Sequence, residues 1–361
     1  MQSPQPITGS YAAEDCEFLL TPLAPRFIAI AEKERLIQRE GRHYSEMISR
    51  ESAPEAGYLA LFHTLTERYR ERLACEIMAL ANHIAESRPE PITLVSLARA
   101  GTPFGALLQR ALTRFFGIQS RHFSVSIIRD RGLDRNALRY ILRTLGRNPK
   151  GLVFADAWTA KGVITRELKA AIADWNRCEP ERLDDRLYVI SDIGGSAEVA
   201  ATYDDYAIPS GILNATVSGL VSRSILNDEI GRDQFHGCVL YEDLHAYDQT
   251  RWFLEAISTA MESAEQFTLP RSERAERAAM TKACLCRWQR NYRIANLNHI
   301  KPGVAEATRV MLRRVPDRLI LRDPAHPDVA HLHLLAERKG VPVEIEPQMP
   351  FNAAAFIQVF R

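Results

Sequence analysis

The feature that most constrains the fold is an apolar run that leads through a short polar loop into a helical pattern, between Gly151 and Trp175. Residues 152–155 are all apolar, which suits a short buried strand. Asp156 follows, and from 163 onward apolar residues recur at helical spacing. Such a unit turns loop amides and a helix N-terminus toward one point, where a phosphate can bind. Taken alone, the stretch fits an ordinary strand–helix connection equally well.

The same succession of strand and helix recurs along the chain. Apolar, branched runs predict strands at 92–97, 123–128 and 187–190, and helical spacing predicts helices at 58–86 and from 105 onward. This alternation predicts an α/β fold with a parallel sheet and helices on both faces. Ligands bind such sheets at the carboxyl ends of the strands. The polar residues expected there are Arg99, Arg129, Arg131, Asp156, Thr159 and Lys161.

Composition narrows the class of protein further. The 361 residues are 46% hydrophobic and 25% charged, as in a globular protein of two domains, or of one domain with an appendage. A net charge of +1 gives no overall attraction to nucleic acid. No apolar run approaches the ~20 residues of a membrane span, and the first residues do not form a signal peptide. We therefore expect a cytoplasmic protein with no membrane partner and with reduced thiols, since the spacing of Cys284 and Cys286 is a weak metal signal.

Four motifs carry a resemblance to a known family. Asp156-Ala-Trp-Thr-Ala-Lys-Gly162 resembles the phosphoribosyl-diphosphate (PRPP) loop of type I phosphoribosyltransferases, and Leu97-Ala-Arg-Ala-Gly101 resembles the pyrophosphate loop of their uracil-specific branch. The chain is more similar to the phosphoribosyltransferase-like family of bacterial tellurite-resistance and stress operons, also labelled "cysteine protease StiP". The matching motifs are SLARAGTPFG (96–105), RHFSVSIIRDRGLD (121–134), DAWTAKG (156–162) and DYAIPSGILNATVSGLVSR (205–223). The resemblance covers about residues 15 to 260, and we expect a phosphoribosyltransferase-like domain over 15–262.

This resemblance implies a glycosyltransferase of the pentosyltransferase type, acting with PRPP or a related phosphosugar on an unidentified base-like acceptor. It implies that Mg²⁺ arrives with the diphosphate and is not held by the protein directly. Asp156 would hold the ribose hydroxyls, and Arg99 would pair with the diphosphate. The implied catalytic residues are Asp156, Lys161 and Arg99. The implied phosphate-binding residues are Ala100, Gly101, Thr102, Arg129, Arg131, Trp158, Thr159, Ala160 and Gly162. The implied acceptor pocket contains Asn214 and Ser218.

The chain departs from the family's usual loop at two positions. Ala157 stands where a second acidic residue is usual, and Lys161 stands where threonine is common. These departures leave open how the ribose is held and whether the donor is PRPP.

Two further segments allow alternatives. Residues 203–226 predict a strand or loop followed by a helix capped at Asn214 or Thr216, or else a wall of the acceptor pocket. His236-Gly-Cys238 would serve a cysteine protease, but Val239-Leu-Tyr241 predicts that Cys238 enters a buried strand, where a thiol is inert. A protease is therefore the third hypothesis. The second is a non-catalytic, nucleotide-sensing RNA-binding protein.

The composition changes after residue 262. Residues 263–290 are highly charged and predict a linker or an exposed helix. Residues 291–361 predict a compact α/β/α sandwich, which resembles the Pelota-type RNA-binding domain. The implied RNA-binding residues are Lys301, Gly303, Glu306, Thr308, Arg309 and Arg313. Since five basic residues outweigh two acidic ones between Lys301 and Arg318, we expect contact with RNA phosphates there. Separately, we expect the protein to form a homo-oligomer.

Overall fold

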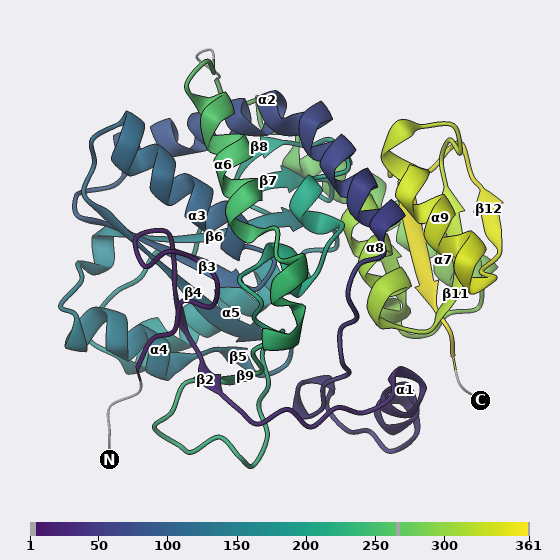
Figure 1. Ribbon diagram of the computed structural model, residues 1–361, viewed down its shortest axis with the longest axis horizontal. Coiled ribbons are helices and arrows are strands. Elements are labelled where there is room, and N and C mark those ends of the chain that lie inside the picture. The colour runs from purple at the N-terminus through teal and green to yellow at the C-terminus, as the bar shows by residue number, and fades with distance from the viewer. Residues whose placement is uncertain (1–4, 265–267, 360–361) are drawn as a thin grey trace.

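The computed structural model describes residues 5–264 and 268–359, which form a large α/β domain and a smaller C-terminal α/β domain beside it (Figure 1). The large domain is built on a sheet with the strand order β1-β4-β3-β6-β7-β8, all parallel, and β5 adds an antiparallel pair to β4. Its strands are β1 (Glu17–Leu19), β3 (Ile92–Ala98), β4 (Ser120–Ile128), β5 (Gly132–Leu133), β6 (Leu152–Thr159), β7 (Leu187–Asp192) and β8 (Val199–Thr202). A small separate sheet pairs β2 (Thr21–Pro22) with β9 (Gly237–Cys238).

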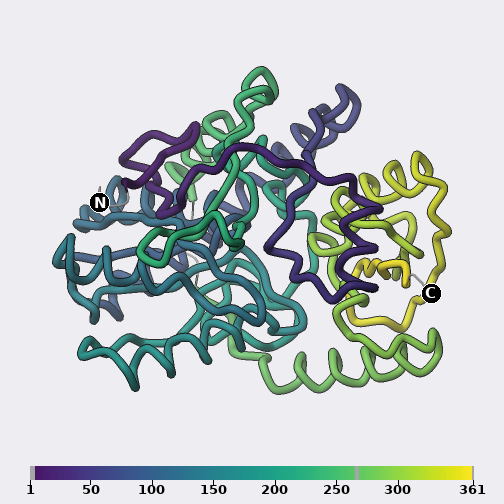
Figure 2. Tube along the Cα trace, turned by 90° about the horizontal axis from the view of Figure 1, so that it is seen from below, coloured from purple at the N-terminus to yellow at the C-terminus, as the bar shows by residue number. Residues whose placement is uncertain are grey.

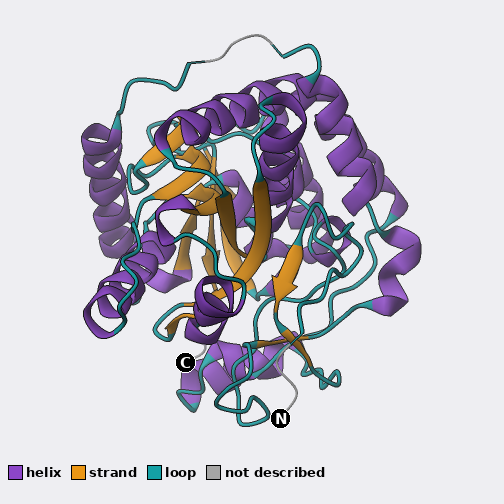
Figure 3. Cartoon of the chain, turned by 90° about the vertical axis from the view of Figure 1, so that its left-hand side faces the viewer, coloured by secondary structure: helices purple, strands orange, loops and turns teal. Residues whose placement is uncertain are grey.

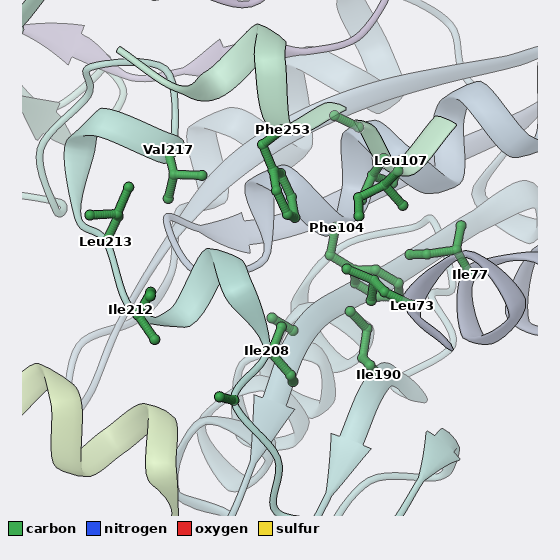
Figure 4. Packing of buried hydrophobic residues seen from close by; sticks show 14 of the residues in the cluster. Leu73, Ile77, Phe104, Leu107, Ile190, Ile208, Ile212, Leu213, Val217 and Phe253 are labelled. Carbon is green, nitrogen blue, oxygen red and sulfur yellow. The ribbon is translucent and has the colours of Figure 1, made fainter. Parts of the chain in front are cut away.

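Helices cover both faces of the large sheet (Figure 3). The first face packs on α2 (Ala56–Ser87), α3 (Thr102–Arg110) and α6 (Thr250–Met261), and the second on α4 (Arg135–Arg139) and α5 (Val163–Cys178). Alternate residues of one strand explain this arrangement, because Val153 joins the first core and Phe154 the second. Figure 4 shows the first core, where Leu73 and Ile77 of α2 meet Phe104 of α3.

The C-terminal domain is a sandwich around a four-stranded sheet with the order β10-β13-β11-β12. The strands are β10 (Ile300–Pro302), β11 (Pro316–Leu321), β12 (Val343–Ile345) and β13 (Ala353–Ile357). Helices α8 (Val304–Arg313) and α9 (Ala330–Lys339) pack on one face through Val310 and Leu332. On the other face, α7 (Arg274–Asn291) packs Trp288 against Phe351 and Phe356. The predicted fold class, a parallel sheet with helices on both faces plus a small α/β/α sandwich, is confirmed.

The segment between β2 and α2 crosses from the large domain to the C-terminal one. It carries α1 (Ile30–Arg39), which lies beside the smaller domain in both views (Figures 1 and 2). Glu34 of α1 is fully buried and forms an ion pair with Arg314 at the end of α8. Gln38 donates to the carbonyl of Gln358 at 2.9 Å. This segment therefore ties the two domains together.

Three local expectations need correction or detail. Residues 203–226 contain no α-helix but two 3-10 turns, Pro209–Gly211 and Ala215–Val217, because Pro209 and glycines at 211 and 219 interrupt helical backbone. Within the expected linker 263–290, α7 begins at Arg274 and packs on the C-terminal sheet. The domain boundaries at 262 and 290 stay predictions.

Candidate binding cleft between the domains

Two adjoining cavities lie where the C-terminal domain meets the large domain. The first, of about 500 Å³, is bounded by α1, the segment 44–55, the turns at 212–216, α8 and the end of α9. The second, of about 310 Å³, is bounded by residues 158–164 and 296–302. They share Ile37, Tyr44, Lys301, Glu306, Arg309 and Arg314. We call the two cavities together the interdomain cleft.

Basic side chains dominate the interdomain cleft. Among the residues that the structure describes there, three are acidic, namely Glu51, Glu55 and Glu306. Eleven are lysine or arginine: Lys33, Arg50, Arg129, Lys161, Arg223, Lys301, Arg309, Arg313, Arg314, Arg338 and Lys339. Like charges that are held together in a partly dehydrated space raise one another's energy, and an anion relieves that cost.

Glu51 neutralises part of this charge at one end of the cleft. Arg99 donates to both its carboxylate oxygens, at 3.1 and 2.6 Å, and Arg313 lies 3.8 Å from one of them. Burial opposes ionisation of Glu51, but the two guanidinium groups outweigh it and hold its pKa at about 2. Arg313 also donates to Asn214 Oδ1 at 2.5 Å. Two guanidinium groups therefore face one carboxylate at this end of the cleft. Burial, with Arg99 adding to it, lowers the pKa of Arg313.

Glu306 of α8 lines both cavities, at the boundary that they share. Arg309 donates to its carboxylate at 2.8 Å, and Lys301 lies 3.8 Å away. The Arg309 guanidinium also stacks on the Trp158 ring of β6, 4.8 Å from its centroid. Burial opposes ionisation of Glu306, but Arg309 and Lys301 outweigh it and hold the pKa at about 2. The face of α8 that was expected to meet RNA thus packs toward the large domain.

The predicted phosphate loop lines the second cavity, but it also contacts the C-terminal domain. The Lys161 amine donates to the carbonyls of Leu297 and Ile300, both at 2.6 Å. Burial, together with the nearby Lys301, lowers the pKa of Lys161 to about 6. Gly162 begins α5 with φ +66°, a conformation that favours glycine. Since its amine already has two acceptors, Lys161 holds the neighbouring domain in place.

Asp156 lies inside β6 and not in the loop after it. Its side chain is buried, and its carboxyl oxygen accepts a hydrogen bond from the Ala157 amide at 2.8 Å. Burial raises its pKa to about 7. The expectation that Asp156 follows the strand, at its carboxyl end, is therefore wrong, because β6 continues pairing with β7 as far as Thr159.

The structure brings only some of the other predicted residues into the cleft. Arg129, Trp158, Thr159, Ala160, Asn214 and Lys301 line it. Arg99 is engaged by Glu51, while Gly101 packs so closely that an added Cβ would lie 2.8 Å from the Ala155 carbonyl oxygen. Arg131 pairs with Glu46 outside the cleft.

Four more of the predicted site residues, which are Thr102, Ser218, Gly303 and Thr308, have structural roles instead. The Thr102 hydroxyl lies 2.7 Å from that of Ser124, and Ser218 donates to the Asn214 carbonyl at 2.9 Å. Gly303 starts α8 with φ +92°. Thr308 is fully buried and bonds to the Val304 carbonyl and His331, so its expected contact with RNA is corrected: no ligand can reach it in this arrangement. Neither Ala100 nor Thr102 lines the cleft.

Several residues that line the cleft were not assigned from the sequence. They are Lys33, Tyr44 and Glu51 of the N-terminal segment, Arg223, and Arg338 and Lys339 of α9. A usable signal was present in α1, where Lys33 and Glu34 fall on the same side as the apolar residues Ile30 and Ile37. Charged residues on the apolar stripe of a helix indicate buried partners or a binding site.

Residues 5–264 and 268–359 contain no cluster of three or more histidine, cysteine or acidic residues arranged to hold a metal ion. Within the same ranges, no helix is both long and apolar enough to span a membrane.

Comparison with known proteins gives two family matches. Residues 9–258 match the family described as "Tellurite-like stress resistance cysteine protease StiP", and residues 279–359 match the "PELOTA RNA binding domain". A protein of Acinetobacter baylyi named "Cysteine protease StiP" is 39% identical over 368 aligned residues, which cover 98% of this chain and 95% of that protein.

Solved structures with similarity to the chain include hypoxanthine phosphoribosyltransferases of Trypanosoma cruzi. One covers 37% of this chain and 77% of its own, with 17% identity and a TM-score of 0.28. Another, in complex with IMP, covers 49% and 90%, with 16% identity and a TM-score of 0.29. Scores this low carry no argument about activity. The expectation of a pentosyltransferase is corrected, because the relative that aligns along nearly the whole chain is named a cysteine protease, which is a hydrolase.

Proposed function

This chain belongs to the StiP family of tellurite-like stress resistance proteins, and we propose that it binds a small phosphorylated ligand, of nucleotide size, in its interdomain cleft. The proposal is supported chiefly by the excess of basic side chains around a partly enclosed space, where eleven are basic and three are acidic. Arginine offers paired donors that match phosphate oxygens.

The dimensions of the cleft favour a small ligand. Its larger cavity, about 500 Å³, lies within the range of small-molecule sites. Apolar and aromatic side chains line it as well, including Tyr44, Ile48 and Tyr58. A ligand with an anionic end and a flat or apolar end would use both kinds of wall.

The three buried cysteines do not favour thiol catalysis. A reactive thiol needs exposure and a lowered pKa. Cys16, Cys238 and Cys284 are buried, and burial raises the pKa of each, to about 12 for Cys238 and Cys284. Among the residues that the structure describes, no hydrogen bond joins a cysteine sulfur to a histidine. His236 instead lies 2.8 Å from the Ser126 hydroxyl.

Titration calorimetry with inorganic diphosphate and ADP tests the proposal. We expect saturable binding that weakens with salt, and a loss of about 10- to 100-fold in affinity in Arg309→Gln, as expected for a charge-assisted hydrogen bond. Arg318→Gln is the matched control, because Arg318 lies outside the cleft and pairs with Asp317 and Glu344. No binding at millimolar concentration, or an equal loss in the control, would contradict the proposal.

RNA binding is a second candidate, favoured by the match of residues 279–359 to an RNA-binding domain. With the domains docked, Lys301, Arg309 and Arg313 face the cleft, so RNA would enter there only through a flexible end or after the domains separate. Replacing Arg309 and Arg313 together by Glu should weaken binding of a single-stranded RNA and reduce its salt dependence. RNA binding that is unchanged in this variant, and that does not compete with diphosphate, would place RNA on another surface.

A further inference from the structure

Lysine is scarce in this chain and concentrated at the cleft. The sequence contains seven lysines against 39 arginines. Four of the seven line the interdomain cleft: Lys33, Lys161, Lys301 and Lys339. A phosphate needs only a cation, which arginine supplies throughout the protein. Lysine adds an amine that can lose its proton and act as a nucleophile, so its placement here points to a chemical use of the amine.

Lys33 is the cleft lysine best placed for such a use. It lies on α1, lines the larger cavity and is 6% exposed. Among the described residues, its side-chain amine has no hydrogen-bond or ion-pair partner, and the adjacent Glu34 pairs with Arg314. Lys161, in contrast, is occupied by two carbonyls, and Lys301 lies 3.8 Å from Glu306.

The surroundings of Lys33 favour its uncharged form. Burial is the largest influence, and the positive charges of Arg223 and Arg314 add to it, so that the pKa falls to about 7. Glu34 acts in the opposite direction, and Arg313 adds a weaker effect of the same sign as the other arginines. Burial also lowers the pKa values of Lys301 and Lys339, with a counteracting effect of Glu306 on Lys301.

We propose that the Lys33 amine forms a reversible imine with an aldehyde that carries a phosphate group, such as an open-chain sugar phosphate. The cations beside Lys33 would hold the phosphate, so this inference rests on the proposed function of the cleft. The nitrogen lone pair attacks the carbonyl carbon, and a carbon–nitrogen bond forms. The two amine hydrogens leave with the carbonyl oxygen as one molecule of water, and no oxidant or reductant takes part.

Pyridoxal 5′-phosphate, which combines an aldehyde and a phosphate, is the probe. The intact protein is incubated with it, reduced with borohydride and mapped by peptide mass spectrometry. At pH 7.4 Lys33 should be labelled at least about tenfold faster than Lys150, because the lowered pKa of Lys33 leaves much of its amine neutral and the cations of the cleft hold the phosphate of the probe beside it. Lys33→Arg replaces the amine by a guanidinium group and should lose the adduct, while Lys150→Arg should not change it.

Three comparisons distinguish this inference from the function on which it rests. Inorganic diphosphate should slow the labelling of Lys33, and pyridoxal without phosphate should label it more slowly. If diphosphate binds in the cleft but Lys33 is labelled no faster than Lys150, the amine proposal is overturned and the binding function stands. If diphosphate does not bind at all, the binding function fails. Should Lys33→Arg fail to fold, Lys33→Met, whose side chain is apolar and of similar length, takes its place.

Discussion

At the residue scale, burial shifts the pKa of several side chains that have no strong ion partner toward their uncharged forms. Asp156 is 8% exposed and Cys238 is fully buried, and burial raises the pKa of both. Lys33 responds to the same cause in the opposite direction, since burial disfavours its charged form. Each of these three side chains therefore tends toward its uncharged form.

The raised pKa of Asp156 predicts a pH-dependent effect of Asp156→Asn. The folded carboxyl titrates near pH 7 and the unfolded one near 3.8, so the parent loses stability as the pH rises through this interval. Asn stays neutral and can still accept from the Ala157 amide. The variant should therefore be more stable than the parent at pH 8, by up to about 4 kcal/mol, with little difference at pH 4. Urea unfolding at both pH values measures this, and equal stabilities at pH 8 would show that Asp156 is not buried as described.

Cys238 should resist alkylation in the native protein. It is fully buried with a pKa near 12, so little thiolate forms and reagents cannot reach it. Cys286 on α7 is exposed and serves as the internal control. Iodoacetamide at pH 8 followed by mass spectrometry should modify Cys286 first. Faster modification of Cys238 in the folded protein would support the thiol catalysis that the name of the relative implies.

At the element scale, periodicity predicted long elements well and short ones poorly. The expected helix at 58–86 and strand at 92–97 correspond to α2 and β3, because their apolar residues face a core. Strands of two or three residues, such as β2 and β10, are too short to show a period. The end of β6 is predicted too early, because the charged Asp156 interrupts the apolar run although residues as far as Thr159 pair with β7.

Helix α1 forms one wall of the cleft, and its position depends on the buried carboxylate of Glu34. Glu34→Gln should leave Arg314 without its ion partner and loosen α1, at a cost of about 1–3 kcal/mol, since the Arg314 side chain is 26% exposed. Limited trypsin digestion should then cleave within α1, after Arg35, faster than in the parent. Glu32→Gln is the control, because Glu32 is exposed and pairs with Arg35 on the same helix. Equal digestion of the two variants would mean that Glu34 does not anchor α1.

At the scale of the whole molecule, the cleft is assembled from segments far apart in the sequence. Residues 30–55, 212–223, 301–314 and 335–339 meet only when the two domains dock. No local pattern could therefore show it. The sequence indicated single cationic loops and a basic helix, but not that the helix packs against the strand ends of the other domain.

Asp205 of the large domain binds the C-terminal domain through hydrogen bonds. Its carboxylate accepts from the amides of Val304, at the start of α8, and Asn352, at 2.8 and 2.7 Å. Asp205→Ala should leave these amides without partners and weaken docking, while Asp204→Ala, which removes an exposed carboxylate paired with Arg72, should not. Small-angle scattering should show a larger radius of gyration for Asp205→Ala alone. An unchanged radius, with unchanged diphosphate binding, would show that other contacts are enough to hold the domains.

The most direct test of the central claim is a crystal structure of the intact protein with inorganic diphosphate. We predict density for the anion in the interdomain cleft, with its oxygens within hydrogen-bond distance of Arg309 or Arg313 and near the Lys33 amine. The same position should be empty or hold water in crystals grown without the anion. Diphosphate bound at full occupancy elsewhere, with only water in the cleft, would contradict the account.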